Sequence, residues 1–402
     1  MHQLIAAPFL DEGHLILRPG SEQGMRIPAG HYDELRQAAE ANGVVPDWLW
    51  SAARDGWSLD LAGRQLNDAV CVRNPGQFGY GRATWELNLG CNYDCEHCYL
   101  GLKRFEGMHW EQRVAVLNVL RDAGVVWLQM TGGEPLIDRL FVDSYHYAWD
   151  LGMMISISTN ASRLWRPEIL NLLRERPAYH ITISVYGATA DTYDALVRRR
   201  GAFATFHRGI TAAAEAGLPM NFNLLATTTN DTEVDGMRAL AEDLGVPYHV
   251  FSNMAPTIQG DANPLAVQSI PLIADRKPFT GCNAGHTFFH VDPHGKASLC
   301  KIGRKPNIDL LAEGVDGLRR LGGIADQLLT RQGGCTGCTV QGTCGTCMPL
   351  VQLYRQAKSP MERYCQHRET GEVIINGTRS STATSADGGT RHDLATSAGT
   401  AC

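Results

Sequence analysis

Short segments of alternating polar and apolar residues recur through the middle of the chain, separated by stretches with helical spacing. The strand-like segments are residues 84–89, 125–130, 153–158, 180–185, 221–226 and 249–251. The helical stretches are residues 110–123, 167–174, 189–198 and 231–244. Strands that alternate with helices form parallel sheets with right-handed crossovers. The pattern therefore predicts an α/β fold of six βα-type units whose sheet curls into a partial barrel.

A cysteine-rich loop follows the first predicted strand. Cys91, Cys95 and Cys98 are separated by three and then two residues. Three thiolates at this spacing can ligate three irons of a 4Fe–4S cluster and leave the fourth iron without a protein ligand. A zinc site normally recruits a fourth ligand nearby, and a disulfide framework needs pairs in an oxidising compartment. The spacing favours iron–sulfur over these two alternatives.

Polar residues also follow the next predicted strands. Gly132, Gly133 and Glu134 come after residues 125–130, where glycines let the backbone approach a ligand and the carboxylate can accept from a charged amine. The alternative is an ordinary turn. Ser158 and Asn160 close the next strand, and Ser184 lies near the end of the one after. They are candidate ligand-binding groups, with strand-end polar residues or helix caps as the alternative.

The three-cysteine loop followed by Gly-Gly-Glu-Pro resembles radical S-adenosylmethionine (radical SAM) enzymes. The resemblance implies a partial (β/α)6 TIM-like barrel over residues 80–260, with S-adenosylmethionine bound at the open iron. It assigns Gly132, Gly133 and Glu134 to the methionine amino group and Ser158, Asn160 and Ser184 to other parts of the cofactor. The implied chemistry is reductive cleavage of S-adenosylmethionine to a 5′-deoxyadenosyl radical, which abstracts hydrogen from a C–H bond.

A second cysteine cluster begins beyond residue 275. Residues 288–291 and 296–299 flank the turn 292–295 and predict a β-hairpin that returns Cys300 towards Cys282. Further thiols follow at Cys335, Cys338, Cys344, Cys347 and Cys365. Two of the C-x2-C pairs also have zinc-knuckle spacing, so a pair of zinc sites is the alternative.

Seven thiols in this order resemble the SPASM extension of radical SAM enzymes, which binds two auxiliary 4Fe–4S clusters. The resemblance implies a small cysteine-rich domain over residues 275–370 and three 4Fe–4S clusters in all. It implies one auxiliary ligand set of Cys282, Cys300 and Cys347, and a second of Cys335, Cys338, Cys344 and Cys365. The interval between Cys344 and Cys347 is two residues where three is typical, so the chain departs from the family pattern at Cys347.

The first 76 residues predict a small α+β extension. Residues 14–19 and 24–28 can form a hairpin, and helical stretches follow at 31–42 and 46–55. This layout resembles the winged-helix modules that bind leader peptides in the maturation of ribosomally made peptides (RiPPs). The alternative is a packing extension that closes the open side of the barrel. At the other end, residues 379–402 are small and polar, and we expect a disordered tail.

Composition limits the partners and the compartment. Lys and Arg number 36 against 42 Asp and Glu, a formal charge of −6 that provides no overall basic footprint for nucleic acid. No apolar run approaches membrane length, and the start of the chain has no basic region before an apolar segment. Low-potential clusters need reduced thiolates. We therefore expect a cytoplasmic protein without nucleic-acid or membrane partners.

Three functional hypotheses follow. The first is an enzyme that crosslinks a ribosomal precursor peptide through a thioether or carbon–carbon bond, using a reductant such as flavodoxin or ferredoxin. The second is a dehydrogenase or oxidative maturase that acts on a small molecule or on a Ser or Cys of a folded protein. The third is a non-catalytic metal-binding module.

Overall fold

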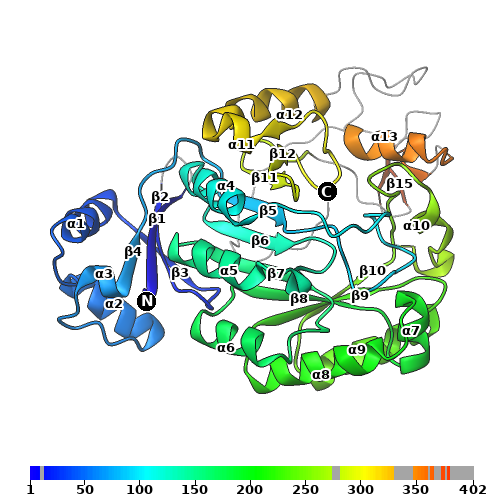
Figure 1. Ribbon diagram of the computed structural model, residues 1–402, viewed down its shortest axis with the longest axis horizontal. Helices are drawn as coiled ribbons and strands as arrows, with labels where there is room; N and C mark the ends of the chain where they lie inside the picture. Colours follow the sequence, from blue (N-terminus) through cyan, green and yellow to red (C-terminus); the bar gives the residue numbers. More distant parts are fainter. Residues whose placement is uncertain are drawn as a thin grey trace.

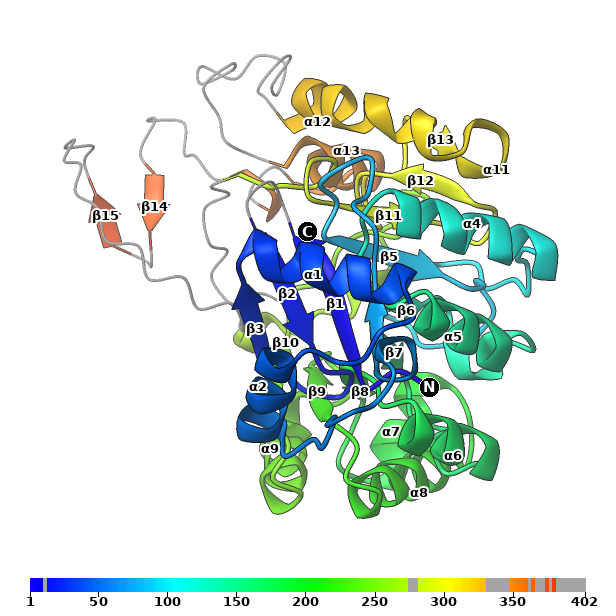
Figure 2. The same cartoon turned by 90° about the vertical axis from the view of Figure 1, so that its left-hand side faces the viewer.

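The computed structural model describes residues 1–9, 13–273, 281–329, 347–360, 363–365, 373–375 and 378–380. An N-terminal unit projects from one side of a central sheet, and residues 281–329 lie along one edge of that sheet (Figures 1 and 2).

The central sheet has nine strands in the order β10-β9-β8-β7-β6-β5-β11-β12-β13. Its first six members are parallel to their neighbours, as the alternating pattern predicts. They are β5 (Arg82–Glu86), β6 (Trp127–Thr131), β7 (Met154–Thr159), β8 (His180–Val185), β9 (Met220–Leu225) and β10 (Tyr248–Phe251). The prediction of six parallel strands joined by helices is confirmed, with boundaries that differ by at most three residues.

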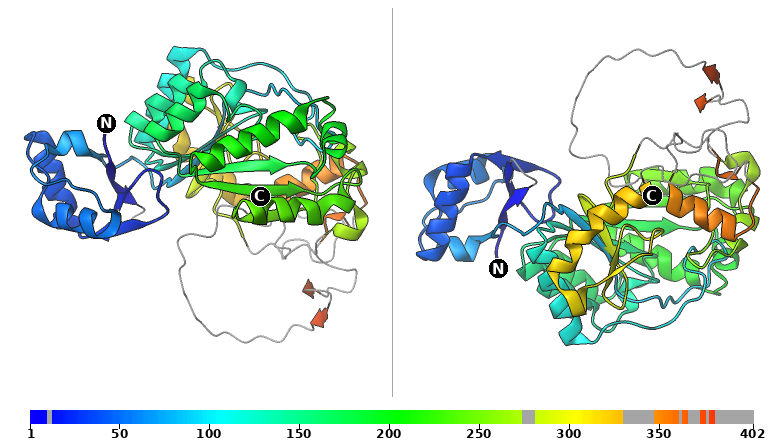
Figure 3. Two further views of the ribbon diagram at one scale, coloured as in Figure 1. Left: turned by 90° about the horizontal axis from the view of Figure 1, so that it is seen from below. Right: turned by 90° about the horizontal axis from the view of Figure 1, so that it is seen from above.

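Helices connect these strands and cover one face of the sheet (Figures 1 and 3). They are α4 (Trp110–Asp122), α5 (Phe141–Asp150), α6 (Pro167–Glu175), α7 (Ala190–Val197), α8 (Ala202–Glu215) and α9 (Val234–Asp243), with a short α10 (Asn263–Ala266) after the last strand. Helices α5 and α8 were not predicted. In the described part of the chain, no helix is both long and apolar enough to span a bilayer.

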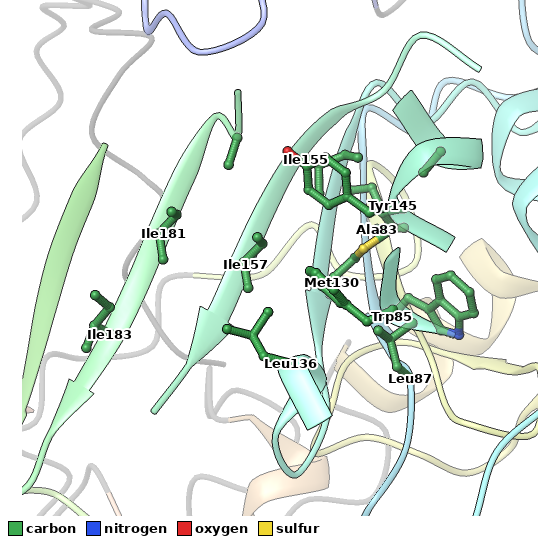
Figure 4. Packing of buried hydrophobic residues seen from close by; sticks show 14 of the residues in the cluster. Ala83, Trp85, Leu87, Met130, Leu136, Tyr145, Ile155, Ile157, Ile181 and Ile183 are labelled. Carbon is green, nitrogen blue, oxygen red and sulfur yellow. The ribbon is translucent and has the colours of Figure 1, made fainter. Parts of the chain in front are cut away.

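Alternate strand residues build the core between sheet and helices. Ile155 and Ile157 of β7 and Ile181 and Ile183 of β8 are fully buried, and the same alternation places Trp85 of β5 inside (Figure 4). Each such side chain contributes about 1.5–3 kcal/mol by leaving water. The core therefore holds the strands in a fixed register, and the loops at their carboxyl ends inherit that register.

The predicted hairpin after residue 281 forms, and it joins the barrel sheet. Strands β11 (Phe288–Val291) and β12 (Lys296–Ser298) are antiparallel, and β13 (Ile308–Asp309) pairs with β12. Strand β11 also pairs in parallel with β5. The C-terminal segment thus extends the barrel sheet. Its helices are α11 (Leu310–Glu313), α12 (Leu321–Leu329) and α13 (Met348–Gln356).

The N-terminal unit is a four-stranded sheet covered by helices on one face. Its strands are β1 (Leu4–Phe9), β2 (Gly13–Leu17), β3 (Gly24–Ile27) and β4 (Val70–Val72), in the order β3-β2-β1-β4. Its helices are α1 (Ala29–Glu40), α2 (Asp47–Trp57) and α3 (Leu66–Ala69). The predicted hairpin is β2–β3, and the two predicted helices are α1 and α2. Strands β1 and β4 were not predicted.

The other face of this small sheet packs on the central barrel. Its buried residues Ile5 and Leu15 share an apolar cluster with Val126, Trp127 and Met154. These three residues lie at the amino-terminal ends of β6 and β7. The unit therefore covers the end of the barrel opposite the cysteine loop. The open side of the barrel next to β5 is occupied by β11 instead.

Part of the predicted C-terminal organisation lies outside the described residues. This applies to Cys335, Cys338 and Cys344 and to residues 381–402. Two residues of the predicted tail belong to β15 (Thr378–Ser380), which pairs with β14 (Val373–Ile375).

Candidate functional site

The three-cysteine loop leaves the carboxyl end of β5 and lies partly buried at the barrel mouth. Burial is the main reason that the pKa of each thiol is raised, to about 12 for Cys91. The neighbouring thiolates Cys98 and Cys91 also raise the pKa of Cys95, so the sulfurs are close enough to interact. The Tyr93 N–H donates to Cys91 Sγ at 3.4 Å. A cationic centre between the three sulfurs would stabilise their thiolate forms.

The Gly-Gly-Glu-Pro turn packs directly on the start of this loop. Gly133 N–H donates to the Asn88 carbonyl and Glu134 N–H to the Gly90 carbonyl, both at 2.9 Å. A Cβ at Gly132, which has φ of +142°, would collide with Asn88, and a Cβ at Gly133 would collide with Gly90. Both glycines are therefore required by the contact between two strand-end loops, a role that the sequence alone did not suggest.

The Glu134 carboxylate is fully buried and joins three chain donors. Oε1 accepts from Thr159 Oγ1 at 2.6 Å and from Leu136 N–H at 3.0 Å, and Oε2 accepts from Asn160 N–H at 2.7 Å. Burial outweighs these hydrogen bonds and raises the pKa of Glu134 to about 7. Because a carboxylate offers about four acceptor sites, one remains for a cofactor amine. The carboxylate therefore ties the turn after β6 to the end of β7.

The structure brings only some of the other predicted cofactor residues to the cysteine loop. Asn160 Nδ2 donates to Asn92 Oδ1 at 2.9 Å and lies 4.0 Å from Cys91 Sγ. Ser158 Oγ instead accepts from Gln129 Nε2 at 2.8 Å, within the sheet. Ser184 lies half-buried in β8, next to Tyr186. Asn160 is thus the best placed of the three.

A buried ionic centre lies at the end of β5, five residues before Cys91. Glu86 is fully buried, and its carboxylate receives both Nη atoms of Arg304 at 2.7 and 2.9 Å. Tyr99 Oη donates to Glu86 Oε1 at 3.2 Å. His290 Nε2 lies 3.4 Å from Oε2. Burial alone would raise the pKa of Glu86, but His290 and Arg304 outweigh it and lower that pKa to about 2.

This centre connects the two cysteine regions. Tyr99 directly follows Cys98, and Arg304 follows Cys300 by four residues. Because an Arg–carboxylate fork fixes both partners in orientation, Glu86 holds the segment after Cys300 against the first cysteine loop. Neither Glu86 nor Arg304 was predicted, since no local motif marks a pair 218 residues apart.

Three described cysteines of the second region lie near one another. Burial raises the pKa of Cys347 to about 11, and Cys300 and Cys282 add to that rise. Cys300 Sγ accepts from Gly303 N–H at 3.2 Å. Cys347 precedes α13, which packs on Cys300 and Ile302 through Leu350 and Leu353. These cysteines are the three that the sequence resemblance assigns to one auxiliary cluster. Cys365 is also described, directly after a short turn at residues 363–364.

The donor set of the first loop fits a 4Fe–4S cluster. It offers three interacting thiols, and the structure supplies an N–H donor to one of the sulfurs. Hydrogen bonds of this kind accompany cluster ligation. Across the residues that the structure describes, no three His, Cys, Asp or Glu side chains converge on one common metal-ion position. Cluster ligation differs because each cysteine binds its own iron.

The comparisons with known proteins agree with this donor set. Residues 85–241 match the model of the radical SAM superfamily. The AdoMet-dependent heme synthase of Methanosarcina barkeri is 33% identical over 187 residues, covering 44% of this chain and 51% of that protein. The mycofactocin maturase MftC of Mycobacterium ulcerans is 30% identical over 237 residues, covering 55% of this chain and 63% of that protein. The chain thus spans between half and two thirds of these relatives.

The fold is also similar to that of a solved structure. SuiB of Streptococcus suis, crystallised with its precursor peptide SuiA, superposes with a TM-score of 0.54 at 14% identity, over 86% of this chain and 94% of SuiB. Radical SAM enzymes use S-adenosylmethionine and a 4Fe–4S cluster, which is the group that the three-cysteine loop fits. Residues 85–241 are therefore a radical SAM domain.

Proposed function

We propose that this enzyme modifies a ribosomally made precursor peptide in RiPP maturation, forming a thioether or carbon–carbon crosslink or a similar modification. The observation that carries the proposal is the N-terminal unit, in which the β1–β2–β3 meander is followed by three helices. This arrangement has the layout of a leader-binding winged-helix module. The relatedness to MftC and the fold shared with SuiB support a peptide substrate.

Strand β3 offers a place for a leader peptide. It is an edge of the small sheet, with Gly24 and Arg26 exposed. An exposed edge strand can accept an extended peptide as an additional strand through main-chain hydrogen bonds. Because the unit is fixed to the amino-terminal end of the barrel, a leader bound there must reach the mouth around the outside. Tethering would raise the effective concentration of the reacting segment there.

The chemistry would be carried out at the barrel mouth. Cys91, Cys95 and Cys98 would hold the cluster, and Glu134 and Asn160 would hold the methionine end of S-adenosylmethionine. When bound, these cofactors supply a one-electron reduction that releases a 5′-deoxyadenosyl radical. The chain itself positions the substrate and excludes water.

Two auxiliary 4Fe–4S clusters complete the proposal. The electrostatic interaction of Cys282, Cys300 and Cys347 supports the first ligand set. The second set is Cys335, Cys338, Cys344 and Cys365, of which the first three lie outside the described residues. The proposal predicts about twelve irons per chain after anaerobic reconstitution, because each cluster contains four.

Leader competition tests the peptide substrate on the intact enzyme. Candidate precursors would be incubated with the reconstituted enzyme, S-adenosylmethionine and dithionite, and mass changes followed by mass spectrometry. We expect the precursor to be modified faster than its leaderless core, and free leader to inhibit the reaction. Deleting the N-terminal unit is a poorer test because it would expose Val126, Trp127 and Met154. Equal rates with and without leader would contradict leader recognition.

The relatedness to a heme synthase supports a second candidate, oxidation of a small molecule. Under that hypothesis the same reconstituted enzyme would consume S-adenosylmethionine faster with an iron porphyrin precursor than with any peptide. Measuring methionine and 5′-deoxyadenosine release with each substrate separates the two candidates.

A further inference from the structure

The first cysteine loop meets solvent at one place. Between Cys91 and Leu100, all of which is described, Asp94 alone is exposed. The remaining residues of the loop are buried or half-buried. Gly133, Glu134 and Asn160 contact the loop on the side assigned to S-adenosylmethionine. An external protein that exchanges electrons with a group held by this loop therefore approaches most closely over Asp94.

Cations surround that position. Lys103 Nζ donates to Asp94 Oδ1 at 2.7 Å, and Arg198 lies 3.8 Å from both Asp94 and Glu96. Arg199 and Arg200 follow, and both are exposed. Neither forms an ion pair with a carboxylate of the described residues, whereas Arg198 and Lys103 do. We call Lys103, Arg198, Arg199 and Arg200 the basic patch. It carries four positive charges beside two carboxylates.

The turn that carries the patch is rigidly held against the loop. Asp94 N–H donates to the Val197 carbonyl at 3.0 Å, which joins the cysteine loop to the end of α7. The Asp194 carboxylate accepts from Gly201 N–H at 2.5 Å and from Phe203 N–H at 2.8 Å. Arg198 adopts a left-handed conformation with φ of 52°, unusual for a residue with a side chain. The structure thus maintains a costly turn that presents consecutive arginines next to the cluster loop.

We infer that the basic patch is the docking surface for an acidic one-electron carrier protein of the flavodoxin type. The chain as a whole carries a charge of −6 and would repel such a carrier. A local excess of positive charge beside the cluster loop overcomes this repulsion and orients the carrier for electron transfer. The carrier loses one electron and the cluster gains it, with no bond made or broken. The inference rests on the proposed radical SAM chemistry.

Reversing the charge of the two patch arginines that do not contact the cysteine loop tests the docking surface. The variant Arg199→Glu/Arg200→Glu leaves Arg198 and its contacts to Asp94 in place. The matched control Arg174→Glu/Arg319→Glu makes the same change in net charge at exposed sites on α6 and in the helical turn before α12. The experiment measures reduction of the reconstituted cluster by reduced flavodoxin in a stopped-flow spectrometer, at several NaCl concentrations.

We expect the patch variant to be reduced about tenfold or more slowly at low salt, and to lose most of the salt dependence seen with the parent. The control variant should behave like the parent. Reduction by dithionite, iron content and dithionite-driven S-adenosylmethionine cleavage should be unchanged in both variants. The milder variant Arg200→Gln should give an intermediate rate.

Two results would overturn the docking surface: a parental rate with flavodoxin in the patch variant, or an equal loss in the control. Reduced dithionite-driven peptide modification with a parental flavodoxin rate would also overturn it and would make the patch a peptide-binding surface. Failure of the parent enzyme to cleave S-adenosylmethionine with dithionite would instead contradict the proposed chemistry, whatever the flavodoxin rates.

Discussion

The two ends of the barrel are joined to their neighbouring segments by different kinds of contact. At the amino-terminal end, the N-terminal unit is attached through an apolar cluster and through Arg73, whose guanidinium donates to the carbonyls of Arg121, Val125 and Gly152. At the carboxyl end, the segment after Cys300 is attached through the buried charge pair of Glu86 and Arg304.

The kind of contact depends on how far it lies from the first cysteine loop. The N-terminal unit is attached at the opposite end of the barrel, whereas the segment after Cys300 is attached next to that loop. At the N-terminal unit the apolar cluster imposes no charge on its surroundings, and the Arg73 guanidinium meets carbonyl oxygens instead of a carboxylate. A buried ion pair costs desolvation and is retained where it fixes the relative orientation of two segments. Glu86 does this between the two cysteine regions. The N-terminal unit needs only to stay attached. Breaking each contact separately tests this contrast.

The largest effect is expected at the cysteine loop itself. Changing Cys91, Cys95 and Cys98 together to Ala should remove about four irons per chain and abolish S-adenosylmethionine cleavage, because the open iron is lost. Iron analysis and 5′-deoxyadenosine release measure this. The contacts at both ends of the barrel should persist, as judged by hydrogen exchange. Retained cleavage would contradict the assigned ligands.

The second-largest effect is expected when Arg304, the buried partner of Glu86, is removed. Arg304→Met leaves the Glu86 carboxylate buried without its bidentate partner and should lower the free energy of unfolding by about 3–5 kcal/mol. Hydrogen exchange should increase in β11 and in the segment after Cys300 but not in β1–β4. The control is Arg304→Lys, which keeps the positive charge but not the bidentate hydrogen bonding. It should lower the free energy of unfolding by less than Arg304→Met does. If hydrogen exchange increased equally at both ends of the barrel, the Glu86–Arg304 pair would not act locally.

Removing Arg73 should have a smaller effect confined to the other end. Arg73→Met keeps the apolar stem but removes the guanidinium hydrogen bonds to the carbonyls of Arg121, Val125 and Gly152, which should cost about 1–3 kcal/mol. Hydrogen exchange should increase in β4 and at the end of α4. Dithionite-driven S-adenosylmethionine cleavage should remain at the parental rate. A large loss of that cleavage would show that the two ends of the barrel are coupled.

The smallest effect is a change in pH dependence from Glu134. Burial raises the pKa of this carboxyl from 4.5 to about 7 in the folded chain. The folded state therefore binds more protons than the unfolded state between these values, and its stability contribution, complete below pH 4.5, is lost as pH rises through 7.

Glu134→Gln should flatten the pH dependence of the melting temperature of the cofactor-free protein in this window. It should also weaken S-adenosylmethionine binding, since a neutral amide replaces the charged acceptor. Glu215→Gln, at an exposed position on α8, is the matched control. An unchanged pH profile together with parental binding would assign Glu134 a purely structural role at the turn.

Local sequence patterns predicted the strands and helices of the barrel well. They predicted poorly how the N-terminal unit and the segment after Cys300 are attached to it. Alternation in residues 180–185 corresponds to β8, and the helical stretch predicted at residues 110–123 corresponds to α4. Helix α8 was missed because it begins after Gly201, which offers no N-cap side chain, although Phe206 and Ile210 are buried on one face. Strand β1 was missed because both of its faces are buried, one under the helices and one against the barrel.

The order of residues along the chain was sufficient to identify the radical SAM domain. Cysteine spacing and the Gly-Gly-Glu-Pro turn are local, because one loop can supply three ligands of a cluster and one turn can approach it. Only the tertiary structure decided what Glu134 and the two glycines contact, where the N-terminal unit attaches, and that Glu86 meets Arg304. Those contacts join residues that are distant in sequence and depend on sheet order and burial, so no spacing along the chain records them.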